Sequence, residues 1–105
     1  MAKILLVEDN SNYRKYMQNL LLQNGHSVDS VAGPIEGLEY FELNEYDLVI
    51  SDLLMEAMDG VKFLSFIKRR NSKIPTMILT GNPSDTTQLQ ALDIYVDKYL
   101  SKDIK

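Results

Sequence analysis

Cysteine is absent from this chain of 105 residues, and His26 is its only histidine. The absence of cysteine excludes disulfides and thiolate metal sites, and one imidazole cannot build a histidine-rich metal centre. Any bound metal would therefore have to be held by oxygen atoms. Oxygen ligands favour a hard cation such as Mg²⁺.

Long hydrophobic runs are missing as well. No segment is long enough to span a bilayer. The apolar run near the N-terminus covers only residues 4–7 and is followed by Glu8 and Asp9, which is not the pattern of a secretory signal. We therefore expect a cytoplasmic protein that makes no contact with membranes.

The chain has fewer basic than acidic residues, 11 against 15, so its formal net charge is −4 at pH 7. A negative balance argues against direct binding to nucleic acid. The chain also has no internal repeat, linker or low-complexity segment, and its hydrophobic content of 45% is ordinary for a globular protein. We expect one domain that covers residues 1–105.

Apolar runs alternate with segments of helical periodicity along the chain. The sequence predicts strands at residues 3–7, 27–31, 48–51, 74–79 and 95–100. After the first strand, an apolar stripe of helical spacing is formed by Tyr13, Tyr16, Met17, Leu20 and Leu21. Asn10 or Ser11 can cap the start of this helix, and Gly25 can end it in the left-handed conformation.

Three further helices are predicted after the second, third and fourth strands. Pro34 suits the first turn of a helix that carries Ile35, Leu38 and Phe41. Asp59 can cap the next helix, which has Val61, Leu64 and Ile67 inward and the basic residues 68–70 at its C-terminal end. A shorter helix is expected across Leu89 and Leu92. Alternating strands and helices predict right-handed crossovers and a parallel sheet covered on both faces, which is a three-layer α/β sandwich.

Polar side chains stand at the carboxyl ends of four of these strands. They are Glu8 and Asp9, Asp52, Thr80 and Lys102. A single polar residue at a strand end is usually a turn or cap residue. In a parallel sheet, however, all of these residues collect at one edge, and in the strand order 2-1-3-4-5 the ligand site lies between the first and third strands.

The chemistry of this set suits a divalent cation and a phosphoryl group. Two close carboxylates such as Asp9 and Asp52 repel each other, and a bound Mg²⁺ resolves that repulsion. Lys102 supplies a mobile positive charge, Thr80 supplies a hydroxyl, and Gly81 allows the backbone to approach an anion closely. Phosphoryl transfer needs mainly positioning and neutralisation of charge, and a carboxylate can be the nucleophile.

With these residues in place, the chain resembles the response-regulator receiver domain of two-component signalling. The motifs that carry the resemblance are residues 4–10 (ILLVEDN), 46–55 (YDLVISDLLM), 58–60 (MDG), 78–81 (ILTG) and 99–102 (YLSK). The resemblance covers essentially the whole chain. It implies a flavodoxin-like fold with a five-stranded parallel sheet of order 2-1-3-4-5.

The resemblance also implies a role for each site residue. Asp52 would be the phosphoacceptor, which takes its phosphoryl group from a sensor histidine kinase or a phosphotransfer protein. Asp9, Asp52 and the carbonyl of Leu54 would bind Mg²⁺ directly, and Glu8 would hold the metal through water. Lys102 would pair with the phosphoryl group.

The same resemblance implies a switch around the phosphoryl group. Thr80 would move to bond to it, beside Gly81, and Tyr99 would turn inward as an aromatic switch. Tyr99 has an equally good reading as a core residue, because an aromatic side chain on an apolar strand usually packs inside. An output domain or a separate downstream protein would read the change.

Several positions depart from the family pattern. Asp103 replaces a proline that follows the lysine, so we expect a trans peptide bond after Lys102. Tyr95 and Val96 replace a glycine-alanine pair, and Glu56 replaces a proline near the metal site. The sequence stops at Lys105, before the fifth helix of the family, so we expect a homodimer, cover from a partner chain, or reduced stability.

Two alternatives to a switching receiver remain. One is a receiver-like interaction module that no longer switches. The other is an aspartyl-phosphate hydrolase, which is disfavoured because such enzymes place a second acid where this chain has Leu54. We therefore expect a signalling protein that is no enzyme beyond its own phosphoryl transfer and dephosphorylation. A flavin-binding protein is also disfavoured, since Glu8 and Asp9 would repel the phosphate of the cofactor.

Overall fold

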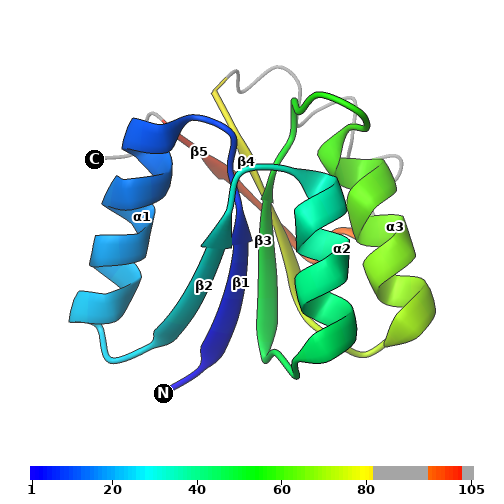
Figure 1. Ribbon diagram of the computed structural model, residues 1–105, viewed down its shortest axis with the longest axis horizontal. Coiled ribbons are helices and arrows are strands. Elements are labelled where there is room, and N and C mark those ends of the chain that lie inside the picture. Colours follow the sequence, from blue (N-terminus) through cyan, green and yellow to red (C-terminus); the bar gives the residue numbers. More distant parts are fainter. Residues whose placement is uncertain (82–94, 103–105) are drawn as a thin grey trace.

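A computed structural model describes residues 1–81 and 95–102 of the chain. Five parallel strands form one sheet in the order β2-β1-β3-β4-β5. They are β1 (Lys3–Val7), β2 (Ser27–Val31), β3 (Leu48–Asp52), β4 (Thr76–Thr80) and β5 (Lys98–Ser101). Helix α1 (Ser11–Gln23) covers one face of the sheet, and α2 (Pro34–Leu43) and α3 (Gly60–Arg70) cover the other (Figure 1). The predicted three-layer α/β sandwich and its strand order are confirmed.

The ends of the described helices follow the predicted local chemistry. Asn10, not Ser11, caps α1, because its side-chain oxygen accepts a hydrogen bond of 2.9 Å from the Tyr13 amide. Gly25 follows this helix with a φ of 87°, the left-handed conformation that favours glycine. Pro34 stands in the first turn of α2, and Asp59 caps α3.

Three strands have different bounds from those predicted. Strand β3 runs one residue further and includes Asp52. Strand β4 begins at Thr76 because Pro75, which has no amide hydrogen, cannot donate to the ladder. Strand β5 begins only at Lys98, and the segment before it forms no ladder. The helix predicted across Leu89 and Leu92 lies outside the described residues.

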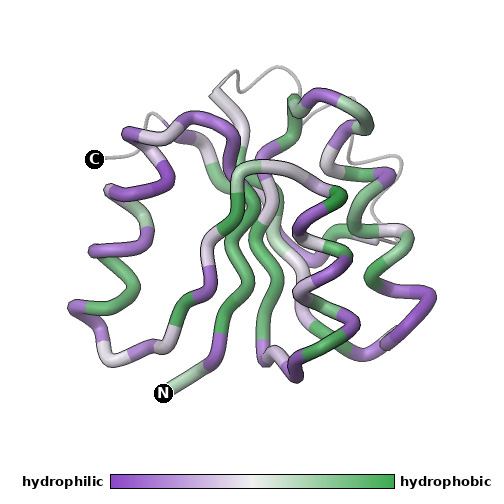
Figure 2. The backbone as a smooth tube through the Cα atoms, viewed as in Figure 1, coloured by the Kyte–Doolittle hydropathy of each residue, from purple (hydrophilic) through white to green (hydrophobic). Residues whose placement is uncertain are grey.

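The sheet carries a separate hydrophobic cluster on each face, and Figure 2 shows the hydrophobic residues concentrated along the central strands. The α2–α3 cluster contains Leu5, Val7, Val31, Tyr46, Val49, Leu53, Phe63, Leu64, Ile67, Ile74, Ile78 and Val96. The smaller α1 cluster contains Ile4, Leu6, Met17, Ile50 and Leu79. Because successive side chains of a strand point to opposite faces, each central strand contributes to both clusters.

The predicted apolar stripe of α1 is only partly buried. Met17 is buried, but Tyr16 and Leu20 are exposed. The five-residue stripe is wider than the line along which one helix touches a sheet, so its outer members face solvent. On α2, Ile35 is exposed for the same reason.

Within the described part of the chain, no helix follows β5, as the sequence predicted. None of the described helices is both long and apolar enough to cross a membrane.

Candidate functional site

The register of the sheet brings the predicted polar residues to one edge. Val7 pairs with Ser51, so the residues that follow β1 lie beside the end of β3. Asp52 pairs with Leu79, and Thr80 pairs with Ser101. The four strand ends are therefore level, and their last residues share one site.

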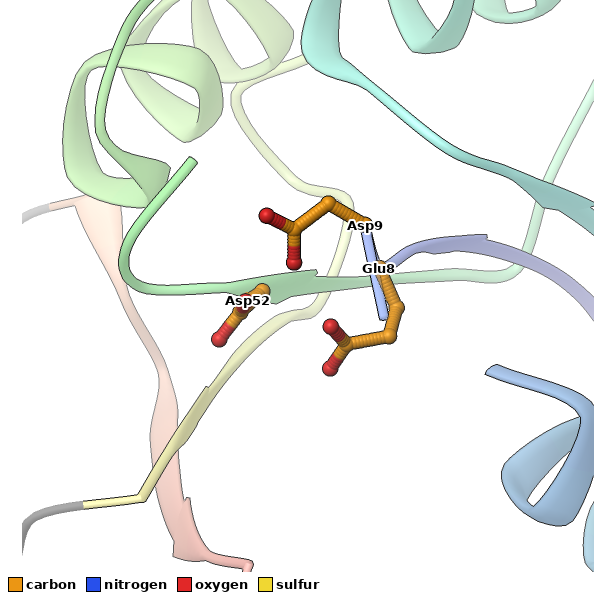
Figure 3. Close-up of side chains that lie close together, drawn as sticks. All are labelled: Glu8, Asp9 and Asp52. Carbon is orange, nitrogen blue, oxygen red and sulfur yellow. The ribbon is translucent and has the colours of Figure 1, made fainter. Parts of the chain in front are cut away.

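Three carboxylates form the centre of this site. One oxygen from each of Glu8, Asp9 and Asp52 lies within 4.8 Å of the others. Figure 3 shows their side chains gathered at the ends of β1 and β3. Glu8 is fully buried and Asp52 is 6% exposed, whereas Asp9 faces solvent. The cluster thus reaches from the protein interior to its surface.

Glu8 is fixed by hydrogen bonds to its backbone and to its side chain. Its amide donates to the Val31 carbonyl at 3.0 Å, and its Oε2 accepts from the Asn10 amide at 3.0 Å. The Arg14 guanidinium donates to the Glu8 carbonyl at 2.7 Å. The first turn of α1 is therefore tied directly to the acidic loop. Sequence reasoning assigned no role to Arg14, and no pattern in the sequence pointed to this contact.

Asp52 is fixed by its backbone and by a close glycine. The next amide, Leu53, donates to the Leu79 carbonyl at 2.9 Å, and the Ser51 hydroxyl donates to the Asp52 carbonyl at 2.9 Å. A Cβ on Gly60 would lie 2.2 Å from the Asp52 carbonyl oxygen. Only glycine permits this approach of α3 to β3. The glycine stood in a quoted motif, but its spatial reason could not be read from the sequence.

Lys102 directly follows the edge strand β5, and its side chain contacts the acids. Its Nζ lies 2.6 Å from Glu8 Oε1 and 3.1 Å from Asp52 Oδ1. Its backbone amide donates to the Thr80 carbonyl at 2.8 Å. The Nζ also lies 4.9 Å from the ring centroid of Tyr13. The sequence placed Tyr13 only in the apolar stripe of the helix, so its place beside the lysine was missed.

Burial and charge shift the titration of this cluster. Burial raises the pKa of Glu8 and the pKa of Asp52, against the opposing effect of Lys102. Burial alone would lower the pKa of Lys102, but its bonds to Glu8 and Asp52 outweigh burial and raise it. The lysine therefore stays charged, while burial disfavours the charged form of the two carboxylates.

Comparison with known proteins decides the family. Residues 4–105 match the family described as Response regulator receiver domain. The chain belongs to this family. Receiver domains act as phosphoacceptors in signalling, and the three carboxylates described above lie within the matched residues.

The receiver domain is similar to several transcriptional regulators. It is 28% identical over 100 residues to the transcriptional regulatory protein TctD of Salmonella typhimurium. It is 30% identical over 100 residues to the transcriptional regulatory protein DltR of Streptococcus agalactiae. Each match covers 95% of this chain but only 45% of the relative, so the chain spans less than half the length of these proteins.

Solved structures give the same fold. The response regulator TrrA of Thermotoga maritima, solved in complex with Mg²⁺ and BeF, matches with a TM-score of 0.90 and 27% identity over 100% of this chain and 90% of that one. The chemotaxis response regulator CheY4 of Vibrio cholerae matches with a TM-score of 0.90 and 25% identity, over 100% of this chain and 89% of that one.

The other predicted site residues of the receiver domain lie in, or just after, strands β3, β4 and β5. Thr80 is buried at the end of β4, and Gly81 follows it on the surface. The side chain of Leu54 is 68% exposed in the loop after β3. Tyr99 is half-buried and packs against the α2–α3 cluster, and its movement as a switch stays a prediction. Asp103 and the peptide bond that joins it to Lys102 reach outside the described residues.

Proposed function

We propose that Asp52 of this receiver domain, spanning residues 1–105, accepts a phosphoryl group from a sensor histidine kinase or a phosphotransfer protein. The observation that carries this assignment is the position of Asp52 between a cation and two acids. One of its oxygens lies 3.1 Å from Lys102 Nζ, and a carboxylate oxygen lies within 4.8 Å of oxygens of Glu8 and Asp9. The proposed output is an attached domain or a separate downstream protein.

The transfer is a displacement at phosphorus. A carboxylate oxygen of Asp52 attacks the phosphorus of a phosphohistidine, the P–N bond breaks, and its electron pair returns to the imidazole nitrogen. Lys102 Nζ is close enough to pair with the phosphoryl oxygens while they gain charge. Because Asp52 is nearly buried and fixed by its backbone, the nucleophile needs little reorganisation before attack.

The acids fit a hard divalent cation. Three carboxylates face one ammonium, which leaves two net negative charges, the charge that one Mg²⁺ would balance. We propose Asp9, Asp52 and the Leu54 carbonyl as direct ligands, with Glu8 acting through water. When bound, Mg²⁺ supplies neutralisation of the charge on the phosphoryl oxygens.

The proposed switch begins with added charge. Phosphorylation adds nearly two negative charges at Asp52. Thr80, Gly81 and Lys102 then respond to the phosphoryl group, and Tyr99 repacks where it now touches the α2–α3 cluster. Strands β4 and β5 carry this movement to a partner, which binds one arrangement better than the other.

A homodimer remains a second proposal for the partner. Met77 and Leu100 pack against the α1 cluster but are only half-buried. A second copy of the chain could cover this face of β4 and β5. Sedimentation of a stable monomer across a wide concentration range would reject it.

The decisive experiment is phosphorylation with a small donor. Purified protein is incubated with acetyl phosphate and Mg²⁺, and its intact mass is followed under acidic conditions. The wild type should gain one phosphoryl mass, and Asp52→Asn should gain none, because the amide has no nucleophilic oxygen. Asp47→Asn, at the opposite end of β3, is the matched control and should behave as the wild type. The proposal fails if the wild type gains no mass from an active donor, or if Asp52→Asn gains as much.

A further inference from the structure

An aromatic ring lies at the tip of the site lysine. The Tyr13 ring centroid is 4.9 Å from Lys102 Nζ, within the range of a cation–π interaction. The same Nζ contacts Glu8 and Asp52. Of these three contacts of the ammonium with described residues, the one with the ring is the only one to an uncharged group.

The ring is fixed by the contacts that begin α1. The Tyr13 amide donates to Asn10 Oδ1 at 2.9 Å, and the Arg14 amide donates to the Asn10 carbonyl at 2.9 Å. The Arg14 guanidinium donates to the Glu8 carbonyl at 2.7 Å. The first turn of α1, which lies at the same end of the sheet as the strand ends (Figure 1), is thus fixed against the acidic loop together with its ring.

The side chain of Lys102 must extend across the sheet edge to contact Asp52. It follows β5 at the edge of the sheet, and β4 lies between β5 and the strand that carries Asp52. A lysine side chain loses about 2 kcal/mol of rotamer entropy when it is held in one conformation. Every residue of β5 is at least partly exposed, so the packing of this strand contributes little to holding the lysine.

The ring differs from the two carboxylates in what else it can bind. Glu8 and Asp52 also belong to the carboxylate group that could bind a metal ion. A bound metal would compete with the Lys102 ammonium for these two carboxylates. The face of an aromatic ring attracts a cation without occupying its hydrogen-bond donors for a phosphoryl oxygen. We propose that Tyr13 is a positioning residue, which holds the Lys102 ammonium over Asp52 during phosphoryl transfer. This inference rests on the proposed function, because it assumes that Asp52 is phosphorylated.

The first test separates the ring from the hydroxyl. Initial rates of phosphorylation by acetyl phosphate are measured for the wild type, Tyr13→Phe and Tyr13→Leu. Loss of the ring in Tyr13→Leu should slow the reaction by about fivefold, the factor that corresponds to about 1 kcal/mol. Tyr13→Phe keeps the ring and should stay within about twofold of the wild type. Tyr40→Leu is the matched control and should have no effect, because Tyr40 is an exposed tyrosine on α2, on the other face of the sheet. Tyr16 is unsuitable as a control, since its ring centroid lies 5.8 Å from that of Tyr13.

A double-mutant cycle then tests whether Tyr13 acts through the lysine. In a Lys102→Met background, Tyr13→Leu should cause no further loss of rate. An equal fivefold loss in both backgrounds would overturn the proposal, as would a wild-type rate in Tyr13→Leu. A loss in Tyr13→Phe equal to that in Tyr13→Leu would also overturn it, because it would assign the effect to the hydroxyl.

A spectroscopic readout keeps the proposal testable without phosphorylation. The ε-methylene protons of Lys102 lie beside the ring and should show a ring-current shift in NMR spectra of the wild type and Tyr13→Phe. The shift should vanish in Tyr13→Leu and persist in Tyr40→Leu. If the wild type shows no such shift, the inference about Tyr13 fails. If the shift is present but the wild type gains no phosphoryl mass, only the proposed function fails.

Discussion

The two halves of the site edge are built in different ways. The acidic half, Glu8, Asp9 and Asp52, stands at the ends of β1 and β3, which lie inside the sheet and are buried from their second residue onward. The basic half, Thr80 and Lys102, stands at the ends of β4 and β5. Strand β5 is an edge strand in which no residue is fully buried.

This difference separates what the core fixes from what individual contacts fix. Any sequence that folds into this sheet brings the ends of β1 and β3 together, because both faces of those strands are packed. The position of Lys102 depends instead on a few named contacts. These are its ion pairs with Glu8 and Asp52, its backbone bond to Thr80, the ring of Tyr13 and the attachment of β5 to the rest of the domain.

A polar clamp attaches the start of β5 to α3 and β4. Lys68 Nζ donates to Asp97 Oδ2 at 2.8 Å and to the Ile74 carbonyl at 2.7 Å. Asp97 Oδ2 also accepts from the Thr76 amide at 2.9 Å, and the Thr76 hydroxyl donates to the Tyr95 carbonyl at 2.7 Å. The clamp gives the edge strand the fixed starting point that its packing does not.

The largest expected effect comes from breaking the acidic half at Gly60. Gly60→Ala would place a Cβ 2.2 Å from the Asp52 carbonyl oxygen, so the backbone of β3 or α3 must move. We expect a loss of about 3 kcal/mol in the free energy of unfolding, measured by urea denaturation. Phosphorylation should slow as well, because Asp52 itself is displaced.

Gly33→Ala is the matched control for this variant. A Cβ there meets nothing within 4 Å, and the φ of −152° suits any residue. Its cost should stay below about 1 kcal/mol, the cost of a poorer helix cap. Equal losses in the two variants would show that close packing at Gly60 does not fix the acidic half.

The next largest effect should come from breaking the clamp of the basic half. Lys68→Met keeps the apolar stem of the side chain but removes the bonds to Asp97 and the Ile74 carbonyl. We expect a loss of about 1.5 kcal/mol, a usual value for bonds to a charged group. Protection of β5 amides in hydrogen exchange should fall more than protection of β1 amides.

Lys62→Met, at an exposed position of the same helix, is the control for Lys68→Met and should leave stability within about 0.5 kcal/mol. A uniform loss of protection across β1 and β5 would contradict the comparison, because it would mean that the edge strand and the core strands open together.

A smaller effect is expected from strain in the loop of the acidic half. Ala57 has a φ of 74° and is the only described residue other than glycine with a positive φ. Relief of this strain in Ala57→Gly should outweigh the added freedom of the unfolded chain and stabilise the protein by about 0.5 kcal/mol. Ala32→Gly is the control. Because Ala32 has no positive φ, this variant should be less stable than the wild type. A loss in both variants would show that the loop stores no strain at Ala57.

The sequence predicted the acidic half more completely than the basic half. Residues such as Asp52 were recognised because strand-end position is a local property of the sequence, and parallel pairing turns it into spatial proximity. The family motifs added roles for residues that already stood in the right place. The strand order, the caps of α1 and α3, the proline in the first turn of α2 and the left-handed glycine followed from equally local signals.

Two of the missed features depend on contacts between distant segments. Tyr13 fitted an apolar helical stripe, and nothing local showed that its ring would meet Lys102 from the other end of the chain. Lys68 lies at the C-terminal end of a helix, where the helix dipole favours a positive charge. This position explained the lysine without its bond to Asp97, so the sequence did not predict that bond. The start of β5 was also misjudged, because apolar content alone does not show where a ladder begins.

The two halves should respond in opposite directions to acid. The hydrogen bond from Lys68 lowers the pKa of Asp97, so the stability that this group contributes is present above the ordinary aspartate pKa near 3.9 and is lost as the pH falls through the folded value. Burial raises the pKa of Glu8 and Asp52, so protonation at falling pH removes the cost of burying their charges in the acidic half.

The last prediction therefore concerns the pH dependence of Asp97→Asn. The wild type should be more stable than the variant at pH 7, and this small difference should shrink below about pH 4, as measured by urea denaturation across the pH range. In a Lys68→Met background the difference should become smaller, because the cation that lowers the pKa of Asp97 most is gone while the bonds from Thr76 remain. A difference that grows toward low pH would contradict the sign derived from the clamp. It would mean that protonation of Asp97 stabilises the basic half, and the contrast between the two halves would then disappear.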